Sequence, residues 1–402
     1  MKLSKFCLTY CDDEIGIIYN TKNNKKIFIN KTEFYNIVYK NNFENVINEF
    51  EQNDFFDETD FKVKNVNYYR EDLLKIRIFT TMNCNAKCSY CYENKLHKFN
   101  LNYKDYSDDL LNFITNNITK RNFKKISIEW FGGEPLLNYK LIRDLSNKLK
   151  DKNIKFKSSI VTNGSLLNKN IIDDLINNCN LYNIQISLDA IGNEYNHIKK
   201  FNYDAFKDIE KNIGYISNNF ENVRILIRTN YSLNIENALN LIEYFGKKKY
   251  RNLKIGCFPV FNDNSNEDSI FLKEHFNYLI IEKLFDFGFI NIKEILPKNL
   301  KYPCVYQSAA YYSILPNGEV YSCDRSYTNS IGNIKSGILN IEKNVDIPKK
   351  CKECKFYLLC LGGCEYERKL GKSGCEFTEK IMNDYFRLAL KAYKRMLHEK
   401  KN

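Results

Sequence analysis

The sequence predicts an α/β protein built around a partial (β/α)6 TIM-like barrel, with a small winged-helix-like module before it and a cysteine-rich segment after it. Three observations support this prediction. Strand-like runs alternate with helical stretches through the middle of the chain, three short strands and two helices fit the first 74 residues, and seven cysteines follow residue 300. The predicted domains are residues 1–74, 75–300 and 301–402.

Length and composition limit the classes of function. The chain has 402 residues, which fits two or three domains. Its 14 cysteines indicate metal binding or catalysis rather than disulfides, because we expect a cytoplasmic protein. No apolar run approaches the length of a membrane span, so no membrane partner is expected. The net charge of +12 is spread along the chain without a nucleic-acid-binding module, so no nucleic-acid partner is expected either.

The first 74 residues predict a small module of strands and helices. Alternating apolar residues predict strands at 5–10, 16–20 and 26–29, and helical spacing predicts helices at 31–40 and 43–52. This order resembles the leader-peptide recognition element of peptide-modifying enzymes, in which a sheet edge adds a peptide strand. A plain N-terminal cap on the catalytic domain is the alternative.

The middle of the chain predicts six βα units. The predicted strands are residues 76–80, 125–131, 155–162, 181–188, 223–229 and 253–258. Residues between them, such as Leu110, Leu111 and Ile114, have helical spacing. Ligands of such parallel sheets bind at the carboxyl ends of the strands, which is where the polar motifs of this chain occur.

Cys84, Cys88 and Cys91 form a C-x3-C-x2-C triplet after the first barrel strand. A [4Fe–4S] cluster normally has four cysteine ligands, so three thiolates at this spacing indicate a cubane with one iron left open for a small molecule. Zinc is the alternative metal for clustered cysteines. The triplet, with the aromatic Tyr90 before its last cysteine, resembles the signature of the radical SAM superfamily. The resemblance implies that S-adenosylmethionine (SAM) binds at the open iron.

The same resemblance implies further SAM contacts at the ends of the next four strands. The Gly-Gly-Glu-Pro turn would bind the methionine amino group, the Thr-Asn-Gly turn matches another family turn, and a Ser-Leu-Asp segment would hold the ribose. A cation beyond that segment and an arginine on the fifth strand would face the methionine carboxylate. Relatives often carry arginine where this chain has Lys200, and lysine lacks the bidentate fork of arginine. The predicted SAM-binding residues are Tyr90, Gly132, Gly133, Glu134, Pro135, Asn163, Ser187, Asp189, Lys200 and Arg228.

Seven cysteines follow residue 300, at positions 304, 323, 351, 354, 360, 364 and 375. Their order resembles the seven-cysteine pattern of the SPASM domain, which carries auxiliary [4Fe–4S] clusters. Zinc ribbons are the alternative for paired C-x2-C units. Some relatives have an eighth cysteine where this chain has Ala310, so one auxiliary iron is expected to be open or bound by another ligand. By this resemblance one cluster is closed by Cys351, Cys354, Cys360 and Cys375, and the other is held by Cys304, Cys323 and Cys364.

The resemblance implies a radical SAM enzyme with one SAM-binding cluster and two auxiliary clusters. Such enzymes generate a 5′-deoxyadenosyl radical, and a reductant such as flavodoxin or ferredoxin supplies the electron. Asp324 occupies the place where sulfatase-maturating relatives keep a catalytic base. The expected substrate is a peptide or protein, engaged through a leader segment, with ribosomal-peptide maturation to a thioether or similar crosslink as the main hypothesis. The alternatives are an anaerobic sulfatase-maturating enzyme that makes formylglycine, and an iron–sulfur or zinc protein of electron transfer.

Overall fold

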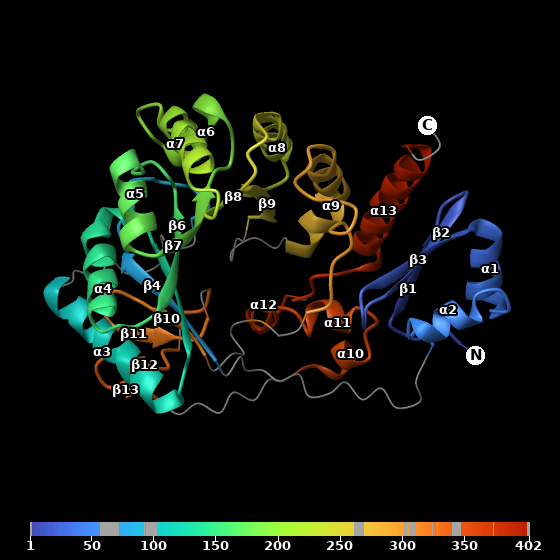
Figure 1. The fold of residues 1–402 in the computed structure, drawn as a ribbon, viewed down its shortest axis with the longest axis horizontal. Coiled ribbons are helices and arrows are strands. Elements are labelled where there is room, and N and C mark those ends of the chain that lie inside the picture. Colours follow the sequence, from blue (N-terminus) through green and yellow to red (C-terminus); the bar gives the residue numbers. More distant parts are fainter. Residues whose placement is uncertain are drawn as a thin grey trace. The chain divides into compact units, whose positions relative to one another are not determined.

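The chain folds into two compact units that each combine distant parts of the sequence. The computed structural model describes residues 2–56, 72–91, 93, 103–260, 269–300, 304, 310–323, 325–327, 329–339, 347–372 and 374–399. The first unit consists of Met1–Tyr68, Ile270–Cys304 and Asn344–Asn402. The second consists of Tyr69–Ser269 and Val305–Lys343 (Figure 1).

The first unit begins with a three-stranded antiparallel sheet and two helices, which confirms the predicted elements of the N-terminal module. Asn30 ends the third strand and caps the first helix, because its side chain accepts a hydrogen bond from the Glu33 amide. Asn41 ends that helix in the left-handed conformation, which asparagine tolerates. The elements are β1 (Cys7–Cys11), β2 (Ile15–Asn20), β3 (Lys25–Asn30), α1 (Lys31–Lys40) and α2 (Ile47–Gln52).

The remaining elements of the first unit are helices from the C-terminal third of the chain. Its C-terminal helix is strongly amphipathic, with Phe386 and Leu388 among its buried residues. No helix within the described residues is both long and apolar enough to cross a membrane. These helices are α9 (Ser269–Asp286), α10 (Lys349–Lys352), α11 (Tyr357–Cys360), α12 (Glu365–Lys369) and α13 (Glu379–Glu399).

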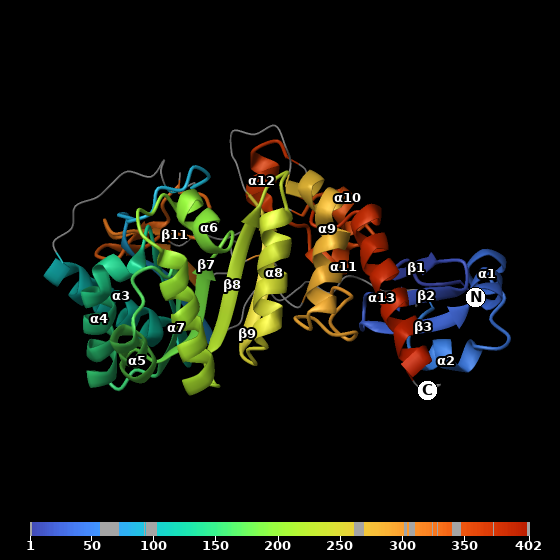
Figure 2. The ribbon, with the colours of Figure 1, turned by 90° about the horizontal axis from the view of Figure 1, so that it is seen from above.

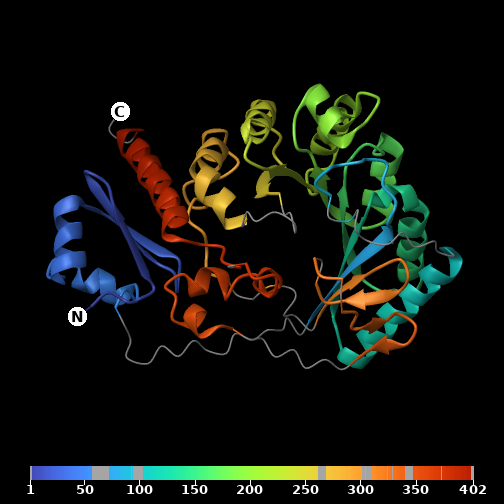
Figure 3. The same ribbon diagram turned by 180° about the vertical axis from the view of Figure 1, so that it is seen from behind.

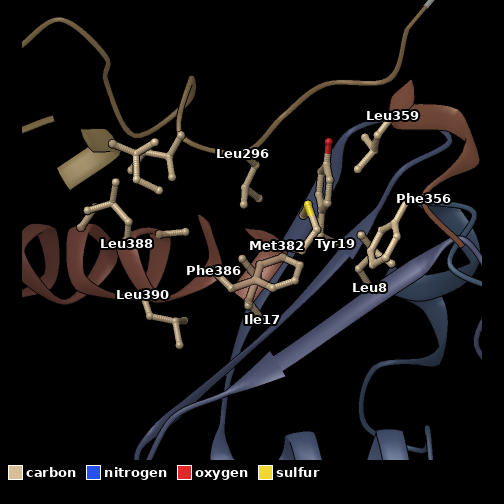
Figure 4. Packing of buried hydrophobic residues seen from close by; sticks show 14 residues of the cluster. Leu8, Ile17, Tyr19, Leu296, Phe356, Leu359, Met382, Phe386, Leu388 and Leu390 are labelled. Carbon is tan, nitrogen blue, oxygen red and sulfur yellow. The ribbon is translucent and has the colours of Figure 1, made fainter. Parts of the chain in front are cut away.

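One apolar cluster joins the N-terminal sheet to the C-terminal helices (Figure 4). Leu8 and Ile17 of the sheet lie in the same cluster as Phe386 of α13 and Leu359 of α11. Phe28 of β3 also stacks on the Tyr393 ring of α13, with centroids 4.1 Å apart. The sheet therefore packs on two apolar clusters, one shared with the cysteine-rich segment and one formed with α1 and α2, in which Ile18 and Ile29 lie beside Phe34.

The second unit is organised by a parallel sheet that contains the six predicted barrel strands. They pair in chain order, from β4 to β9, within a ten-stranded sheet. The agreement with the predicted strands is within three residues at every end. The strands are β4 (Leu73–Thr81), β5 (Lys125–Gly132), β6 (Phe156–Thr162), β7 (Leu181–Ser187), β8 (Arg224–Tyr231) and β9 (Leu253–Pro259).

Helices cover one face of these strands (Figure 2). On β5 the side chains of Ile126, Ile128 and Trp130 are buried, whereas Glu129 and Phe131 alternate with them and point to the other face. This alternation leaves the inner face of the barrel for polar groups. The helices are α3 (Tyr103–Arg121), the 3-10 helix η2 (Pro135–Asn138), α4 (Tyr139–Asp151), α5 (Lys169–Asn178), α6 (Gly192–Lys199), α7 (Ala205–Asn219) and α8 (Glu236–Lys248).

Four short strands from beyond residue 310 extend the barrel sheet past β4 (Figure 3). The first of them pairs in parallel with β4, and the others follow in antiparallel order. The sequence predicts this segment as part of a separate C-terminal domain, residues 301–402, whereas residues 305–343 belong to the same compact unit as the barrel. The strands are β10 (Tyr311–Ile314), β11 (Glu319–Tyr321), β12 (Gly332–Asn333) and β13 (Gly337–Ile338).

Candidate active site

A cavity of about 300 Å³ opens at the carboxyl ends of the barrel strands. Parallel register brings these ends together: Thr81 pairs with Gly132, and Ser187 pairs with Arg228. The cavity is thus built from residues that are far apart in the sequence, as expected for a parallel sheet. The predicted site residues that line it are Cys84, Cys88, Tyr90, Cys91, Gly132, Gly133, Asn163, Ser187 and Arg228.

The two glycines of the Gly-Gly-Glu-Pro turn pack against the backbone that leads into the cysteine triplet. A Cβ atom at Gly133 would lie 2.3 Å from the Asn83 carbonyl oxygen. Gly132 has a φ of +129°, which side chains rarely adopt, and its Cβ would lie 2.1 Å from the Thr81 carbonyl oxygen. The Gly133 amide donates to Thr81 O at 3.0 Å, and the Glu134 amide donates to Asn83 O at 2.8 Å. The turn therefore fixes the start of the cysteine loop, which we define as residues 84–91.

Glu134 lies behind the cavity wall and has no exposed surface. Its Oε1 accepts hydrogen bonds from the Thr162 hydroxyl at 2.7 Å and the Leu136 amide at 3.1 Å, and its Oε2 accepts one from the Asn163 amide at 2.8 Å. Burial raises the pKa of the Glu134 carboxyl group to about 7, and these three hydrogen bonds offset only part of the effect. The Glu134 carboxyl group thus connects the turn after β5 to the end of β6.

Asn163 connects this arrangement to the triplet. Its side-chain amide donates to Asn85 Oδ1 at 2.9 Å and lies 3.9 Å from Cys84 Sγ. Its carbonyl accepts a hydrogen bond from the Tyr195 hydroxyl at 2.7 Å. The Thr-Asn-Gly turn is therefore in contact with the cysteine loop. The sequence marks this turn only by its resemblance to a turn of the radical SAM family.

Asp189 forms an ion pair with Lys199 at 2.7 Å, and each side chain is only 3% exposed. The Tyr90 hydroxyl hydrogen-bonds with both side chains. Burial alone would lower the pKa of Lys199, but the Asp189 carboxylate, Cys88 and Tyr195 together outweigh burial and raise it. Burial and the same carboxylate raise the pKa of Tyr90. Lysine therefore stays charged beside the triplet, and tyrosine stays protonated.

The predicted SAM-binding residues do not all reach the cavity. Lys200 is exposed and ends α6 with a left-handed φ of 57°, whereas its neighbour Lys199 lines the cavity. Glu134, Pro135 and Asp189 lie behind the lining rather than in it. Asp324, the predicted base, lies outside the described residues.

Two lining arginines were not anticipated from the sequence. Arg77 on β4 donates from Nε to Glu129 Oε2 at 2.5 Å, and its guanidinium lies 4.3 Å from the Phe131 ring centroid. Arg325 lies between β11 and β12 of the strand extension and also lines the cavity. Alternation along β4 and β5 places Arg77 and Glu129 on one inner face, so the strand pattern contained a signal for this pair. No local motif marks Arg325.

The triplet thiols have a donor set that suits an iron–sulfur cluster. They border one cavity, and the Ala86 amide donates to Cys84 Sγ at 3.4 Å. Hydrogen bonds to sulfur of this kind tune such clusters. Burial raises the pKa of the Cys84 thiol, and the Ala86 amide counteracts part of that effect. Among the residues that the structure describes, no three Cys, His, Asp or Glu side chains meet as around a single ion.

Four cysteines of the first unit interact electrostatically with one another. The thiol of Cys351 interacts with those of Cys354 and Cys375, and the thiol of Cys360 interacts with Cys351 and Cys354. The Cys364 amide donates to the Gly374 carbonyl at 2.9 Å, so the residue before Cys375 lies beside Cys364. The cysteines predicted to close one auxiliary cluster therefore share one region.

The other three cysteines of the predicted SPASM pattern do not share one unit. Cys304 and Cys364 belong to the first unit, and Cys323 belongs to the second. The Arg325 amide donates to Cys323 Sγ at 3.4 Å, which repeats the arrangement at Cys84.

Comparisons with known proteins agree with this geometry. The family model described as the radical SAM superfamily matches residues 78–271. Radical SAM cyclopropyl synthase TigE of Paramaledivibacter caminithermalis is 24% identical over 377 residues, which cover 83% of this chain and 75% of that protein. The cysteine-type anaerobic sulfatase-maturating enzyme of Clostridium perfringens is 23% identical over 323 residues, which cover 70% of this chain and 85% of that protein.

Solved structures share the fold. The structure described as native anSMEcpe with bound AdoMet and Cp18Cys peptide has a TM-score of 0.58 at 20% identity, with 81% of this chain and 98% of that chain covered. The structure of Streptococcus suis SuiB bound to precursor peptide SuiA has a TM-score of 0.51 at 15% identity, with 94% and 99% covered.

Proposed function

The chain is an enzyme of the radical SAM superfamily, and on that premise we propose that it modifies a peptide or protein substrate. The favoured reaction is ribosomal-peptide maturation to a thioether or similar crosslink. The observation that carries this proposal is one cavity that joins the three thiols of the triplet to four strand ends with polar groups. The relatives named as a cyclopropyl synthase and a sulfatase-maturating enzyme, and the neighbours with bound peptides, support it.

In this proposal Cys84, Cys88 and Cys91 hold a [4Fe–4S] cluster through three thiolates. When bound, the cluster and SAM would together supply the 5′-deoxyadenosyl radical, so the cofactors would carry the difficult chemistry. The chain's own residues bind, orient and shield these groups. Phe131 and Val161 form an apolar part of the cavity wall, which helps to exclude water.

Side chains of opposite charge would hold the ammonium and carboxylate groups of the methionine part of SAM. Although Glu134 lies behind the cavity lining, its Oε2 accepts only one hydrogen bond among the described contacts, and a nearby cation favours the ionised acid. Its carboxylate would therefore hold the methionine ammonium group. Arg228 would face the methionine carboxylate, and its guanidinium is oriented by stacking at 4.0 Å on the Phe258 ring. The Ser187 hydroxyl, which lines the same cavity, would contact the ribose.

The auxiliary clusters complete the proposed cofactor set. The shared region of Cys351, Cys354, Cys360 and Cys375 supports one cluster with four protein ligands. Cys304, Cys323 and Cys364 would hold the second, and an open iron there would bind a substrate thiolate. Asp324 would act as the base that receives a substrate proton.

The N-terminal sheet is the proposed contact for a leader segment. Its outer strands β1 and β3 each pair with β2 only, among the strands that the structure describes. An edge strand can receive an extended peptide through main-chain hydrogen bonds. Flavodoxin or ferredoxin would supply electrons.

The decisive experiment combines the enzyme with its peptide. We would co-express it with a small cysteine-containing peptide encoded beside its gene and analyse the peptide by mass spectrometry. A loss of two hydrogens per crosslink, together with 5′-deoxyadenosine, is expected. An unchanged peptide, when the same enzyme preparation cleaves SAM, would reject the peptide-crosslinking proposal.

Sulfatase maturation is the second candidate, because the Clostridium perfringens relative carries that name. A sulfatase-derived peptide that contains the target cysteine distinguishes the two reactions. Formylglycine formation exchanges the cysteine sulfur for oxygen and creates an aldehyde that hydrazide reagents label, whereas a thioether keeps its sulfur. Aldehyde labelling of the sulfatase peptide alone would favour the second candidate.

A further inference from the structure

The buried ion pair between Asp189 and Lys199 lies next to the cysteine loop. Asp189 follows β7 and Lys199 is the last residue of α6, so the pair joins a strand end to a helix end. Lys199 Nζ lies 2.7 Å from Asp189 Oδ2, and both side chains are 97% buried. Removal of one partner from such a pair leaves an uncompensated buried charge, so the pair holds both elements in one arrangement.

Two contacts connect this pair to the cysteine loop. The Lys199 ammonium donates to the Tyr90 hydroxyl oxygen at 2.7 Å, and that hydroxyl donates to Asp189 Oδ2. The Lys199 carbonyl also accepts a hydrogen bond from the Lys87 amide at 3.0 Å. The loop is therefore bound by a side chain near its end and by a main-chain amide near its middle.

Asp189 is also anchored on the side away from the loop. Its Oδ1 accepts hydrogen bonds from the Asn230 amide at 2.9 Å and from the Asn230 side chain at 3.1 Å. Both carboxylate oxygens are thus engaged by protein donors, and the ribose contact expected from the sequence stays a prediction. Asp189 is suited to act through Tyr90 and Lys199.

We propose that Asp189 and Lys199 form a latch that positions the cysteine loop, and that the Lys199 charge raises the reduction potential of the cluster which the loop holds. The second half of this inference rests on the proposed cluster, whereas the first half does not. Lys199 interacts electrostatically with Cys88 as well as with Asp189. Reduction adds a negative charge to a thiolate-bound cluster, and a buried cation close to it stabilises that charge with little screening by salt.

Loop positioning is tested by hydrogen exchange of residues 84–91, measured by mass spectrometry. Lys199→Gln should speed exchange about tenfold or more, because it removes the charged donor that binds the Tyr90 hydroxyl. Lys199→Arg should restore most of the protection. Lys207→Gln removes an exposed lysine from α7 and serves as the matched control, with no change in the loop. Loop exchange in Lys199→Gln equal to the control would overturn the latch.

The electrostatic half is tested by redox titration of the triplet cluster, followed by electron paramagnetic resonance. Lys199→Gln should lower the reduction potential, and Asp189→Asn should raise it, because the two substitutions remove charges of opposite sign. The double variant should return towards the wild-type value. Shifts of the same sign in both single variants would indicate distortion alone and would overturn the proposal.

These readouts are independent of substrate turnover. If Lys199→Gln does not fold, Asp189→Asn and the double variant still test the sign of the potential shift. If the wild type binds a cluster but no peptide is modified, the proposed peptide substrate fails and the latch stands. If no cluster binds, the exchange experiment alone decides the positioning role, and the effect on potential is rejected.

Discussion

Glu134 is a carboxyl group that connects two turns of the site from a fully buried position. The Thr162 hydroxyl and the Leu136 and Asn163 amides all donate to it. Such a group stabilises local structure in either protonation state, but burial favours the neutral acid. Its pKa of about 7 means that it ionises in the physiological range, where a bound ammonium group would decide its charge.

This buried acid predicts a pH-dependent stability. Because the folded state raises the pKa from 4.5 to about 7, its contribution is complete below pH 4.5 and is lost as the pH rises towards 7. The loss amounts to about 3 kcal/mol, since each tenfold change in proton affinity is worth about 1.4 kcal/mol. Urea unfolding of SAM-free protein between pH 5 and 8 should show this slope, and Glu134→Gln should remove it. Parallel pH profiles for the two proteins would contradict the assignment.

Substitution of Cys88 in the triplet should abolish SAM cleavage while the auxiliary clusters are retained. We expect Cys88→Ala to reduce 5′-deoxyadenosine formation at least a hundredfold, because even partners beyond the metal ligands cost up to about that factor. The auxiliary clusters should remain visible by Mössbauer spectroscopy. Cys179→Ala is the control, because Cys179 is buried in the barrel unit and belongs to no motif. Undiminished cleavage in Cys88→Ala would show that this cysteine is not a ligand.

Single residues also mark the limit of prediction from sequence. Spacing to the Ser-Leu-Asp segment pointed to Lys200, yet the lysine in the cavity wall is Lys199. The difference arises because α6 ends in a left-handed residue at Lys200, which turns that position towards solvent. Spacing along the chain does not record such a turn. The cysteines were easier to recognise, because their chemistry depends on residue type and interval.

At the scale of elements, the strands of the barrel were predictable and the sheet extension was not. β4 to β9 are apolar runs bounded by polar ends, and this pattern can be recognised from the sequence alone. β10 to β13 contain two to four residues each, too few for an alternating pattern. β10 pairs with β4, more than 230 residues earlier, so Tyr311 lies beside Lys75. Only the fold brings such segments together.

The Gly-Gly-Glu-Pro turn predicts a steric effect on the cysteine loop. Gly133→Ala would place a methyl group 2.3 Å from the Asn83 carbonyl oxygen, so the backbone before Cys84 must move. We expect a loss of about 1–3 kcal/mol of stability and weaker retention of the triplet cluster. Calorimetry and iron analysis measure the two effects.

Gly192→Ala is the matched control for that substitution. Gly192 has a φ of +57° but no atom near its missing Cβ, so alanine there incurs only a conformational cost of about 1 kcal/mol. Iron should be retained in this variant. Equal iron loss in both variants would mean that contact with Asn83 is not the cause.

At the scale of the whole molecule, the two compact units cut across the linear order of the chain. The N-terminal sheet shares an apolar cluster with α13 and with Phe356 (Figure 4). Cys354 is partly buried and packs against that same cluster. The sheet and the cysteine-rich segment are therefore parts of one folded body. This arrangement links the proposed peptide-binding edge to the proposed cluster ligands through ordinary hydrophobic packing.

Cys354→Ala tests the cofactor assignment of that body. With three [4Fe–4S] clusters the enzyme should contain about 12 iron atoms per chain, and this variant should contain about 8. SAM cleavage should persist without product, since the triplet lies in the other unit, whereas peptide modification should fail. Cys11→Ala is the control, because Cys11 also packs at the edge of an apolar cluster but follows no ligand pattern, and it should keep all its iron. A wild-type iron content in Cys354→Ala, or zinc in place of iron in the native enzyme, would refute the auxiliary cluster at this position.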